Sequence, residues 1–262
     1  MQIADFGDVQ INYRIDGDPD GAPLVFANSL GTDYRLWDQV LPLLRDGLRI
    51  IRFDKRGHGL SSCPAAPYSM GALVTDTERL LDHLNVRDCL FVGLSIGGMI
   101  AQGLAVKRMD QVRAMVISNT GAKIGTPEMW ADRIEGVRKG GIEALADAVM
   151  ERWFSGAFRQ KPELAAWRNM LTRTPADGYM GCSAAISGTD FYTTTASLSL
   201  PTLAIAGSED GSTPPDLVRE TAALIKGSRF HLIRGSGHLP CVENPVEFAR
   251  VLNDFITETG HV

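Results

Sequence analysis

Short apolar runs alternate with longer segments of helical periodicity along the chain. Compact apolar runs typical of buried strands lie at residues 23–27, 48–53, 89–94, 114–118, 203–206 and 230–233, and residues 9–15 alternate like an edge strand. Helical spacing covers residues 36–44, 70–84, 96–106 and 217–225, and a last helix begins with Asn244 as N-cap and Pro245 at its first position. Apolar strands separated by helices predict an α/β fold with a mostly parallel sheet covered by helices on both faces.

The alternation of strand and helix patterns is interrupted between residues 121 and 200, where no strand pattern is present. The interruption is rich in helix formers, tryptophan and arginine, and residues 128–137, 142–154 and 163–171 have helical patterns. We therefore expect a core formed by residues 1–120 and 199–262, with a helical cap over residues 121–198 that covers one edge of the sheet.

Composition and charge narrow the class of protein. Of the 262 residues, 44% are hydrophobic, which excludes a disordered chain. The net charge of −5 argues against binding to nucleic acid or to an anionic membrane, since both attract positively charged surfaces. The four cysteines have no metal-ligand spacing and are expected to be reduced thiols. The N-terminus lacks the pattern of a secretory signal, and the uncharged stretch 90–106 is marginal for a membrane span. We expect a soluble, cytoplasmic protein without a metal or organic cofactor.

The strongest chemical signal is Gly93-Leu94-Ser95-Ile96-Gly97, which lies between an apolar strand and an apolar helix. A sharp strand-to-helix turn leaves the serine in a strained conformation that bulkier neighbours would block, so small residues are required two positions before and after it. The same turn sets Ser95 at a helix N-terminus, which favours negative charge. The pattern predicts a nucleophile, and the alternative is a glycine-rich packing turn.

A serine nucleophile needs a base, and the chain has five histidines. His83 lies in a helix, His231 lies in a strand, and His261 is next to the C-terminus. His58 in a glycine-rich loop is a minor candidate. His238 follows the last strand, so it emerges at the same edge of the sheet as the serine and is the predicted base.

The remaining parts of such a site are an acid and an oxyanion hole. The strand at residues 203–206 is followed by Glu209 and Asp210, and both are candidates for the acid. Asp210 is favoured because the three residues between it and the strand give the loop room to turn toward the histidine. The alternative role of Asp210 is to cap the helix that follows. Two backbone N–H groups must face the tetrahedral oxygen, and we assign them to Ile96 and to Leu30 in the loop after residues 23–27.

These residues resemble the α/β-hydrolase superfamily, whose chain order of nucleophile, acid and histidine they follow. More closely, they are similar to the 3-oxoadipate enol-lactonases, and four segments carry this likeness: Asn28-Ser29-Leu30-Gly31-Thr32, Asp54-Lys55-Arg56-Gly57-His58-Gly59-Leu60-Ser61, Gly93-Leu94-Ser95-Ile96-Gly97-Gly98 and Gly235-Ser236-Gly237-His238. The superfamily usually has His-Gly where this chain has Asn28-Ser29, and the lactonases share that departure.

The resemblance implies an α/β-hydrolase fold and hydrolysis of a small-molecule lactone through an acyl-enzyme on Ser95, in the β-ketoadipate route of aromatic-compound catabolism. It implies no cofactor, no nucleic acid and no membrane partner. Because the enol-lactone carries a carboxylate, the cap should supply a cation from among its several lysines and arginines, which include Arg152. We favour Arg133 for this role, with Trp153 as an indole donor or apolar wall.

Two other functions stay open. A carboxylesterase or related hydrolase would act on another small ester or lactone, and the cap cation would then be dispensable. A ligand-binding homologue would keep the triad without turnover. A dehalogenase or epoxide hydrolase would need aspartate in place of Ser95 and is excluded.

Overall fold

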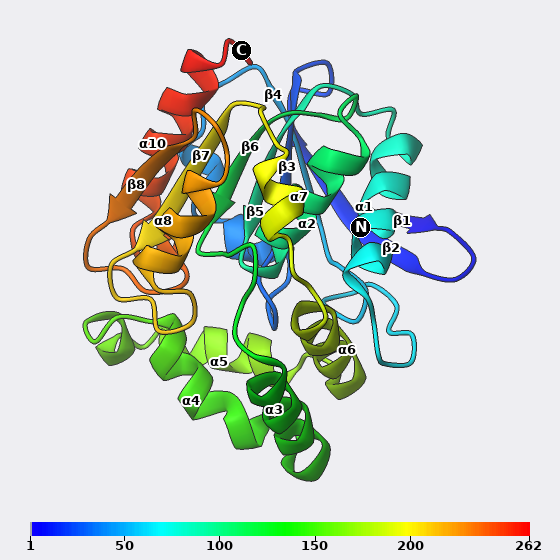
Figure 1. Ribbon diagram of the computed structural model, residues 1–262, viewed down its shortest axis with the longest axis vertical. Helices are drawn as coiled ribbons and strands as arrows, with labels where there is room; N and C mark the ends of the chain where they lie inside the picture. Colours follow the sequence, from blue (N-terminus) through cyan, green and yellow to red (C-terminus); the bar gives the residue numbers. More distant parts are fainter. Residues whose placement is uncertain (1) are drawn as a thin grey trace.

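One eight-stranded sheet forms the centre of the molecule in a computed structural model that describes residues 2–262 (Figure 1). Its order is β1-β2-β4-β3-β5-β6-β7-β8; β1 and β2 are antiparallel to their neighbours, and β3 to β8 are parallel. The strands are β1 (Gln2–Asp5), β2 (Gln10–Gly17), β3 (Ala22–Ala27), β4 (Leu48–Phe53), β5 (Cys89–Leu94), β6 (Val112–Ser118), β7 (Thr202–Gly207) and β8 (Arg229–Ile233). The mostly parallel sheet predicted from the apolar runs is confirmed.

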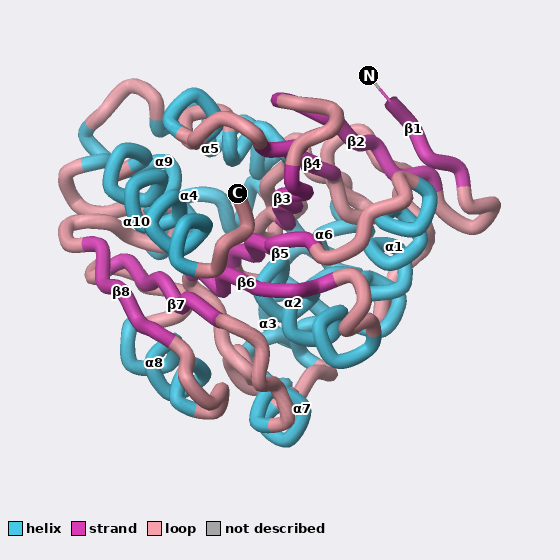
Figure 2. Tube along the Cα trace, turned by 90° about the horizontal axis from the view of Figure 1, so that it is seen from above, coloured by secondary structure: helices cyan, strands magenta, loops and turns pink. Residues whose placement is uncertain are grey.

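Helices cover both faces of this sheet, as Figure 2 shows. One face carries α1 (Met70–His83), α2 (Ile96–Lys107) and α8 (Pro215–Ala223). The other carries α9 (Pro240–Glu243) and α10 (Pro245–Glu258). The short helices η1 (Tyr34–Trp37) and η2 (Leu41–Leu43) lie on the same face, where η1 contacts α9 and η2 contacts α10. No helix within residues 2–262 has the length and apolar character that crossing a bilayer requires.

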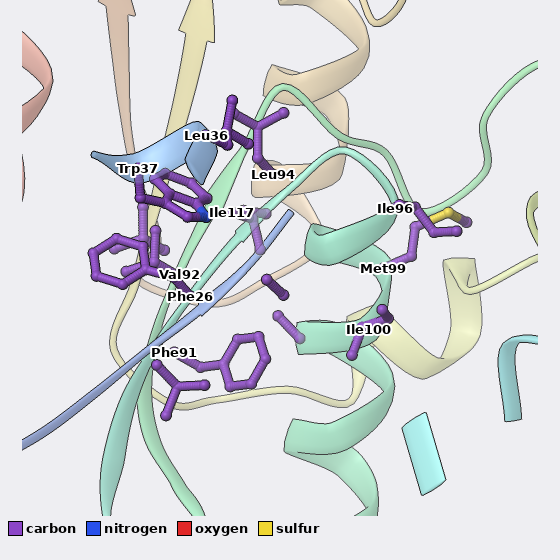
Figure 3. Close-up of a cluster of buried hydrophobic side chains, with 14 of the residues drawn as sticks. Phe26, Leu36, Trp37, Phe91, Val92, Leu94, Ile96, Met99, Ile100 and Ile117 are labelled. Atoms are coloured by element: carbon purple, nitrogen blue, oxygen red, sulfur yellow. The ribbon is translucent and has the colours of Figure 1, made fainter. Parts of the chain in front are cut away.

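The hydrophobic core lies where the central strands meet these two helical layers. Every residue of β5 is buried, as expected for a strand covered on both faces. Figure 3 shows Trp37 of η1 packed against one side of the sheet and Met99 and Ile100 of α2 on the other. The ring of Trp37 lies 4.6 Å from that of Phe26, between centroids. This rigid centre fixes the strand ends that carry the candidate site.

A group of helices lies at the end of the sheet toward which the parallel strands run (Figure 1). It consists of α3 (Pro127–Gly140), α4 (Glu143–Trp153), η3 (Phe158–Gln160), α5 (Leu164–Thr172) and α6 (Ala176–Ser187). We call these helices the cap. The short helix α7 (Tyr192–Ala196) follows them but packs against α2 rather than within the cap.

Several predicted elements differ from the structure. Residues 36–44 form η1 and η2 instead of one helix, because Pro42 has no N–H to donate within a helix. Strand β1 lies outside the predicted edge strand and is only four residues long, too short to give a periodic signal. Asn244 is the N-cap residue of α10, but its side chain donates to Glu247 Oε2 at 3.2 Å instead of accepting from the helix backbone.

Candidate active site

The candidate nucleophile Ser95 occupies the turn between β5 and α2. Its backbone is strained, with φ of 58° and ψ of −120°, as the strand-to-helix turn requires. A Cβ on Gly93 would collide with the carbonyl of Gly97, and one on Gly97 would collide with the carbonyl of Ala27. The two glycines are therefore needed for this turn to form, which agrees with the reason for their spacing in the sequence.

The candidate base and acid come from the ends of β8 and β7. His238 Nδ1 lies 2.8 Å from Asp210 Oδ2, and both side chains are buried. Glu209, the alternative acid, lies outside this pair, and its Oε2 accepts from the Gly156 backbone N–H at 3.4 Å. The structure thus brings Asp210, rather than Glu209, to the histidine.

Asp210 is surrounded by hydrogen-bond donors. Its Oδ1 accepts the backbone N–H groups of Ser212 and Thr213 at 2.7 and 3.0 Å, and its Oδ2 accepts Asn119 Nδ2 at 2.8 Å and Thr213 Oγ1 at 2.7 Å. Burial by itself would raise the pKa of this carboxyl, but the charge of His238 and the donors outweigh it and lower the pKa. Asp210 is therefore an anion at neutral pH, suited to hold an Nδ1–H tautomer of His238.

The other ring nitrogen of His238, Nε2, is the atom through which the histidine would act as base toward a serine. Ser95 and His238 line the same cavity, although no hydrogen bond joins their side chains among residues 2–262. His238 Nε2 instead lies 3.4 Å from Ser29 Oγ, a contact that the sequence did not suggest. Catalytic hydrogen bonds often tighten only once substrate is bound.

The two predicted oxyanion donors lie at the same strand ends. Ile96 is the first residue of α2, and Leu30 lies in the loop after β3, where it lines the cavity. Neither backbone N–H donates to a protein acceptor anywhere in the described residues 2–262. Both donors are therefore available to an oxygen on the substrate.

The cap closes the other side of the cavity, whose volume is about 100 Å³. Trp130 and Arg133 of α3, Arg152 and Trp153 at the end of α4, and Tyr179 of α6 line it. The Arg133 guanidinium stacks 4.6 Å from the centroid of the Trp130 ring. Both predicted cap residues, Arg133 and Trp153, therefore face the same cavity as the serine and histidine.

Arg152 is one of the basic cap residues from which the sequence analysis favoured Arg133, and it adds a second guanidinium group to this end of the cavity. Neither Arg133 nor Arg152 forms an ion pair with a carboxylate of residues 2–262. Burial and the neighbouring charge of Arg133 lower the pKa of Arg152, while burial raises the pKa of Tyr179 against the influence of both arginines. Two adjacent, unpaired guanidinium groups in a partly buried cavity favour an anionic ligand.

Backbone hydrogen bonds also join the cap to the loops that carry the candidate acid and base. The His238 N–H donates to the Trp153 carbonyl at 2.7 Å, and the Gly211 N–H donates to the Arg152 carbonyl at 3.1 Å. The cap residues Arg152 and Trp153, which line the cavity, are thus joined to both loops that carry the candidate acid and base. Across residues 2–262 there is no group of three His, Cys, Asp or Glu side chains arranged to hold a metal ion.

A buried serine at a strained strand–helix turn, with a histidine and an acid at neighbouring strand ends, is the arrangement expected of an α/β-hydrolase. The chain belongs to the alpha/beta hydrolase family, whose model matches residues 24–251. It is 35% identical to 3-oxoadipate enol-lactonase 2 of Acinetobacter baylyi over 243 residues, which are 92% of this chain and 91% of that protein.

Solved structures of two relatives are closely similar. The enol-lactonase from Burkholderia xenovorans LB400 superposes with a TM-score of 0.94 at 34% identity, covering 98% of this chain and all of that one. A thermophilic esterase from Thermogutta terrifontis gives a TM-score of 0.92 at 26% identity, with both chains fully covered. The chain is thus a hydrolase related to enol-lactonases, on a fold that also serves other esterases.

Proposed function

We propose that the protein hydrolyses 3-oxoadipate enol-lactone to 3-oxoadipate with Ser95, His238 and Asp210 as a catalytic triad. The observation that carries this proposal is the pair of unpaired arginines, Arg133 and Arg152, in the cavity that also contains the serine and histidine. A neutral ester gives no reason to keep two guanidinium groups there, whereas a lactone with a carboxylate arm does. The identity to two enol-lactonases of Acinetobacter baylyi, 35% and 33%, supports the choice of lactone.

The acylation step follows from the orientation of His238. With Nδ1–H held by Asp210, Nε2 accepts the proton of Ser95 Oγ as this oxygen bonds to the lactone carbonyl carbon. The resulting oxyanion is stabilised by the N–H groups of Leu30 and Ile96. Its collapse breaks the ring C–O bond, and His238 returns the proton to the departing enol oxygen. Tautomerisation of the enol to a ketone then removes the nucleophile that could close the ring again.

Deacylation uses the same groups. His238 Nε2 takes a proton from water as the water oxygen attacks the acyl carbon, and the same oxyanion donors stabilise the second intermediate. The acyl C–O bond then breaks, and Ser95 Oγ regains its proton from His238. The product is 3-oxoadipate, a compound of the β-ketoadipate route of aromatic catabolism, which places the enzyme in the cytoplasm in this proposal.

The cap residues orient the substrate in this proposal. Arg133, held over Trp130, and Arg152 bind the carboxylate arm, and Trp153 forms an apolar wall beside the lactone ring. Arginine suits this role because its planar fork forms two parallel hydrogen bonds to a carboxylate.

Substitution of one cation tests the proposal. Arg133→Met keeps the apolar stem of the side chain and removes the charge. Because loss of one partner of a desolvated ion pair costs about 2–5 kcal/mol, kcat/KM for the enol-lactone should fall about 30-fold or more. Hydrolysis of uncharged p-nitrophenyl acetate should stay within about twofold of the wild-type rate, since its transition state does not use the cation.

Arg138→Met is the matched control, because Arg138 lies on the same helix but is exposed and pairs with Glu135 at 2.6 Å. It should leave kcat/KM unchanged on both substrates. A proportional loss on both substrates in Arg133→Met would contradict a specific role in carboxylate binding and indicate structural damage. No loss on either substrate would also contradict that role and would favour another cap residue or an esterase with a neutral substrate.

A further inference from the structure

Lys55 is a buried cation that the mechanism above does not use. It follows strand β4, its side chain is only 3% exposed, and it forms no ion pair with a carboxylate of residues 2–262. Its Nζ instead donates to two backbone carbonyls, those of Ser29 at 2.6 Å and Thr32 at 3.3 Å. A buried charge is costly unless it is compensated, so this placement needs an explanation beyond packing.

Both acceptors belong to the loop that carries the oxyanion donor Leu30. The Ser29 carbonyl and the Leu30 N–H are the two ends of one planar, trans peptide group, so they point in opposite directions. Fixing the carbonyl toward Lys55 therefore directs the Leu30 N–H away from Lys55. The Thr32 N–H and Oγ1 also donate to the Ser29 carbonyl, at 3.3 and 2.9 Å, but Lys55 makes the shortest contact, at 2.6 Å, and is the only cation among the three. Lys55 thus helps to orient a donor that it does not touch.

Other buried contacts hold the rest of the loop. The Gly31 N–H donates to His58 Nε2 at 2.9 Å, and Asn28 Nδ2 donates to the Phe53 carbonyl at 2.8 Å. Burial and the charge of Lys55 lower the pKa of His58 well below its usual value, so the ring stays neutral and can accept from Gly31. These contacts fix the position of the loop, but none of them adds charge to the Leu30 peptide.

We propose that Lys55 is a positioning residue of the oxyanion hole, whose ammonium group orients and polarises the Leu30 N–H through the peptide that joins Ser29 to Leu30. A cation on the carbonyl oxygen of an amide draws electron density from its nitrogen, which strengthens the N–H as a donor. The effect is greatest when negative charge develops on the substrate oxygen, so it acts on the transition state more than on bound substrate. This inference rests on the proposed serine mechanism, but not on the identity of the lactone.

The charge of Lys55 should also be visible in the dependence of rate on pH. Burial lowers the pKa of Lys55 to about 8, against opposing influences from Cys182, Asp54 and Asp33. Burial also raises the pKa of Cys182 to about 12, so this thiol and the neutral His58 do not titrate near pH 8. The turnover number should therefore fall as pH rises through about 8, while the uncharged amine still donates a hydrogen bond.

Unfolding does not account for that fall. A lysine whose pKa is lower in the folded chain than its usual 10.5 binds its proton more weakly when folded. Between pH 8 and 10.5 the unfolded state then holds more protons, so this group makes the folded state more stable as pH rises. Rate and stability are expected to change in opposite directions with the titration of Lys55.

The test compares Lys55→Met with the wild type on p-nitrophenyl acetate, between pH 6 and 10. Loss of a complete oxyanion donor costs about 10²–10³ in kcat, so weakening one of two donors should lower kcat by about tenfold to 10²-fold with KM within about twofold. Affinity for a trifluoromethyl ketone, which forms a tetrahedral adduct with the serine, should fall by a similar factor. Lys123→Met, at an exposed lysine paired with Asp190, is the control and should change neither quantity.

Equal losses in kcat and in 1/KM, or an alkaline fall near pH 8 that persists in Lys55→Met, would overturn the proposal. If circular dichroism shows that Lys55→Met does not fold, the wild-type profile decides: a constant kcat from pH 7 to 10 overturns the proposal, and a fall through about pH 8 with unchanged ellipticity supports it. Wild-type cleavage of the ester without cleavage of the enol-lactone rejects the proposed substrate and leaves the role of Lys55 intact.

Discussion

Replacing Asp210 by asparagine should abolish most activity for a reason that the surrounding donors dictate. Oδ1 accepts two backbone N–H groups, from Ser212 and Thr213, which cannot turn away, so the amide oxygen of asparagine must take that place. The amide NH₂ then occupies the place of Oδ2 and faces His238 Nδ1 and Asn119 Nδ2. It can donate to the ring only if Nδ1 is unprotonated, and this tautomer places the proton on Nε2.

A histidine protonated on Nε2 cannot accept the proton of Ser95. The equivalent change in a serine protease lowers kcat about 10⁴-fold, which corresponds to about 5.4 kcal/mol of transition-state stabilisation. The measurement is kcat for ring opening of the enol-lactone, followed by ultraviolet absorbance. Glu209→Gln is the matched control, because Glu209 is adjacent in sequence but contacts only the Gly156 N–H, and it should retain activity within about threefold. Equal losses for the two variants, or a larger one for Glu209→Gln, would refute the reasoning.

Four further outcomes are expected. Ser95→Ala should lower kcat about 10⁴-fold or more with an unchanged circular dichroism spectrum, and residual activity above a tenth of wild type would reject this nucleophile. Arg152→Met should lower kcat/KM for the enol-lactone about tenfold, a smaller loss than for a fully buried pair because this side chain is only partly buried, and it should spare a neutral ester. Ser29→Ala removes the 3.4 Å contact with His238 Nε2 and should lower kcat about three- to tenfold, with no change in KM. Folding lowers the pKa of Asp210 below its usual 3.8, so its carboxylate stabilises the folded state above about pH 4, and this stability is lost as the pH falls further. In denaturant unfolding, the difference in stability between wild type and Asp210→Asn should therefore shrink below about pH 4.

The sheet and the strained turn were predictable because their signals are local. Strand β5 is buried on both faces and therefore reads as an unbroken apolar run, and the glycines beside Ser95 are demanded by the turn itself. Helix α6 was missed because most of its positions are buried around its circumference, so it lacks the apolar stripe that marks an amphipathic helix.

The polar contacts of the site could not be predicted from the sequence and were identified only in the three-dimensional structure. Lys55 reaches the carbonyl of Ser29 across 26 positions of sequence, and Arg152 meets Arg133 only because α3 and α4 pack together. The hydrophobic periodicity of the sequence does not indicate such contacts, since each depends on the course of a loop. Trp130 could have been found, because it precedes Arg133 by three residues and so shares its face of the helix.

The most direct test of the central claim is the ratio of kcat/KM for 3-oxoadipate enol-lactone to that for p-nitrophenyl acetate, measured on the purified wild-type enzyme. An active site with two cap arginines for a carboxylate should favour the lactone by about 30-fold or more, the free energy expected for one such ion pair. Both activities should disappear together in Ser95→Ala. Cleavage of the neutral ester with equal or greater efficiency than the lactone would contradict the claim that this cavity selects a carboxylate-bearing substrate.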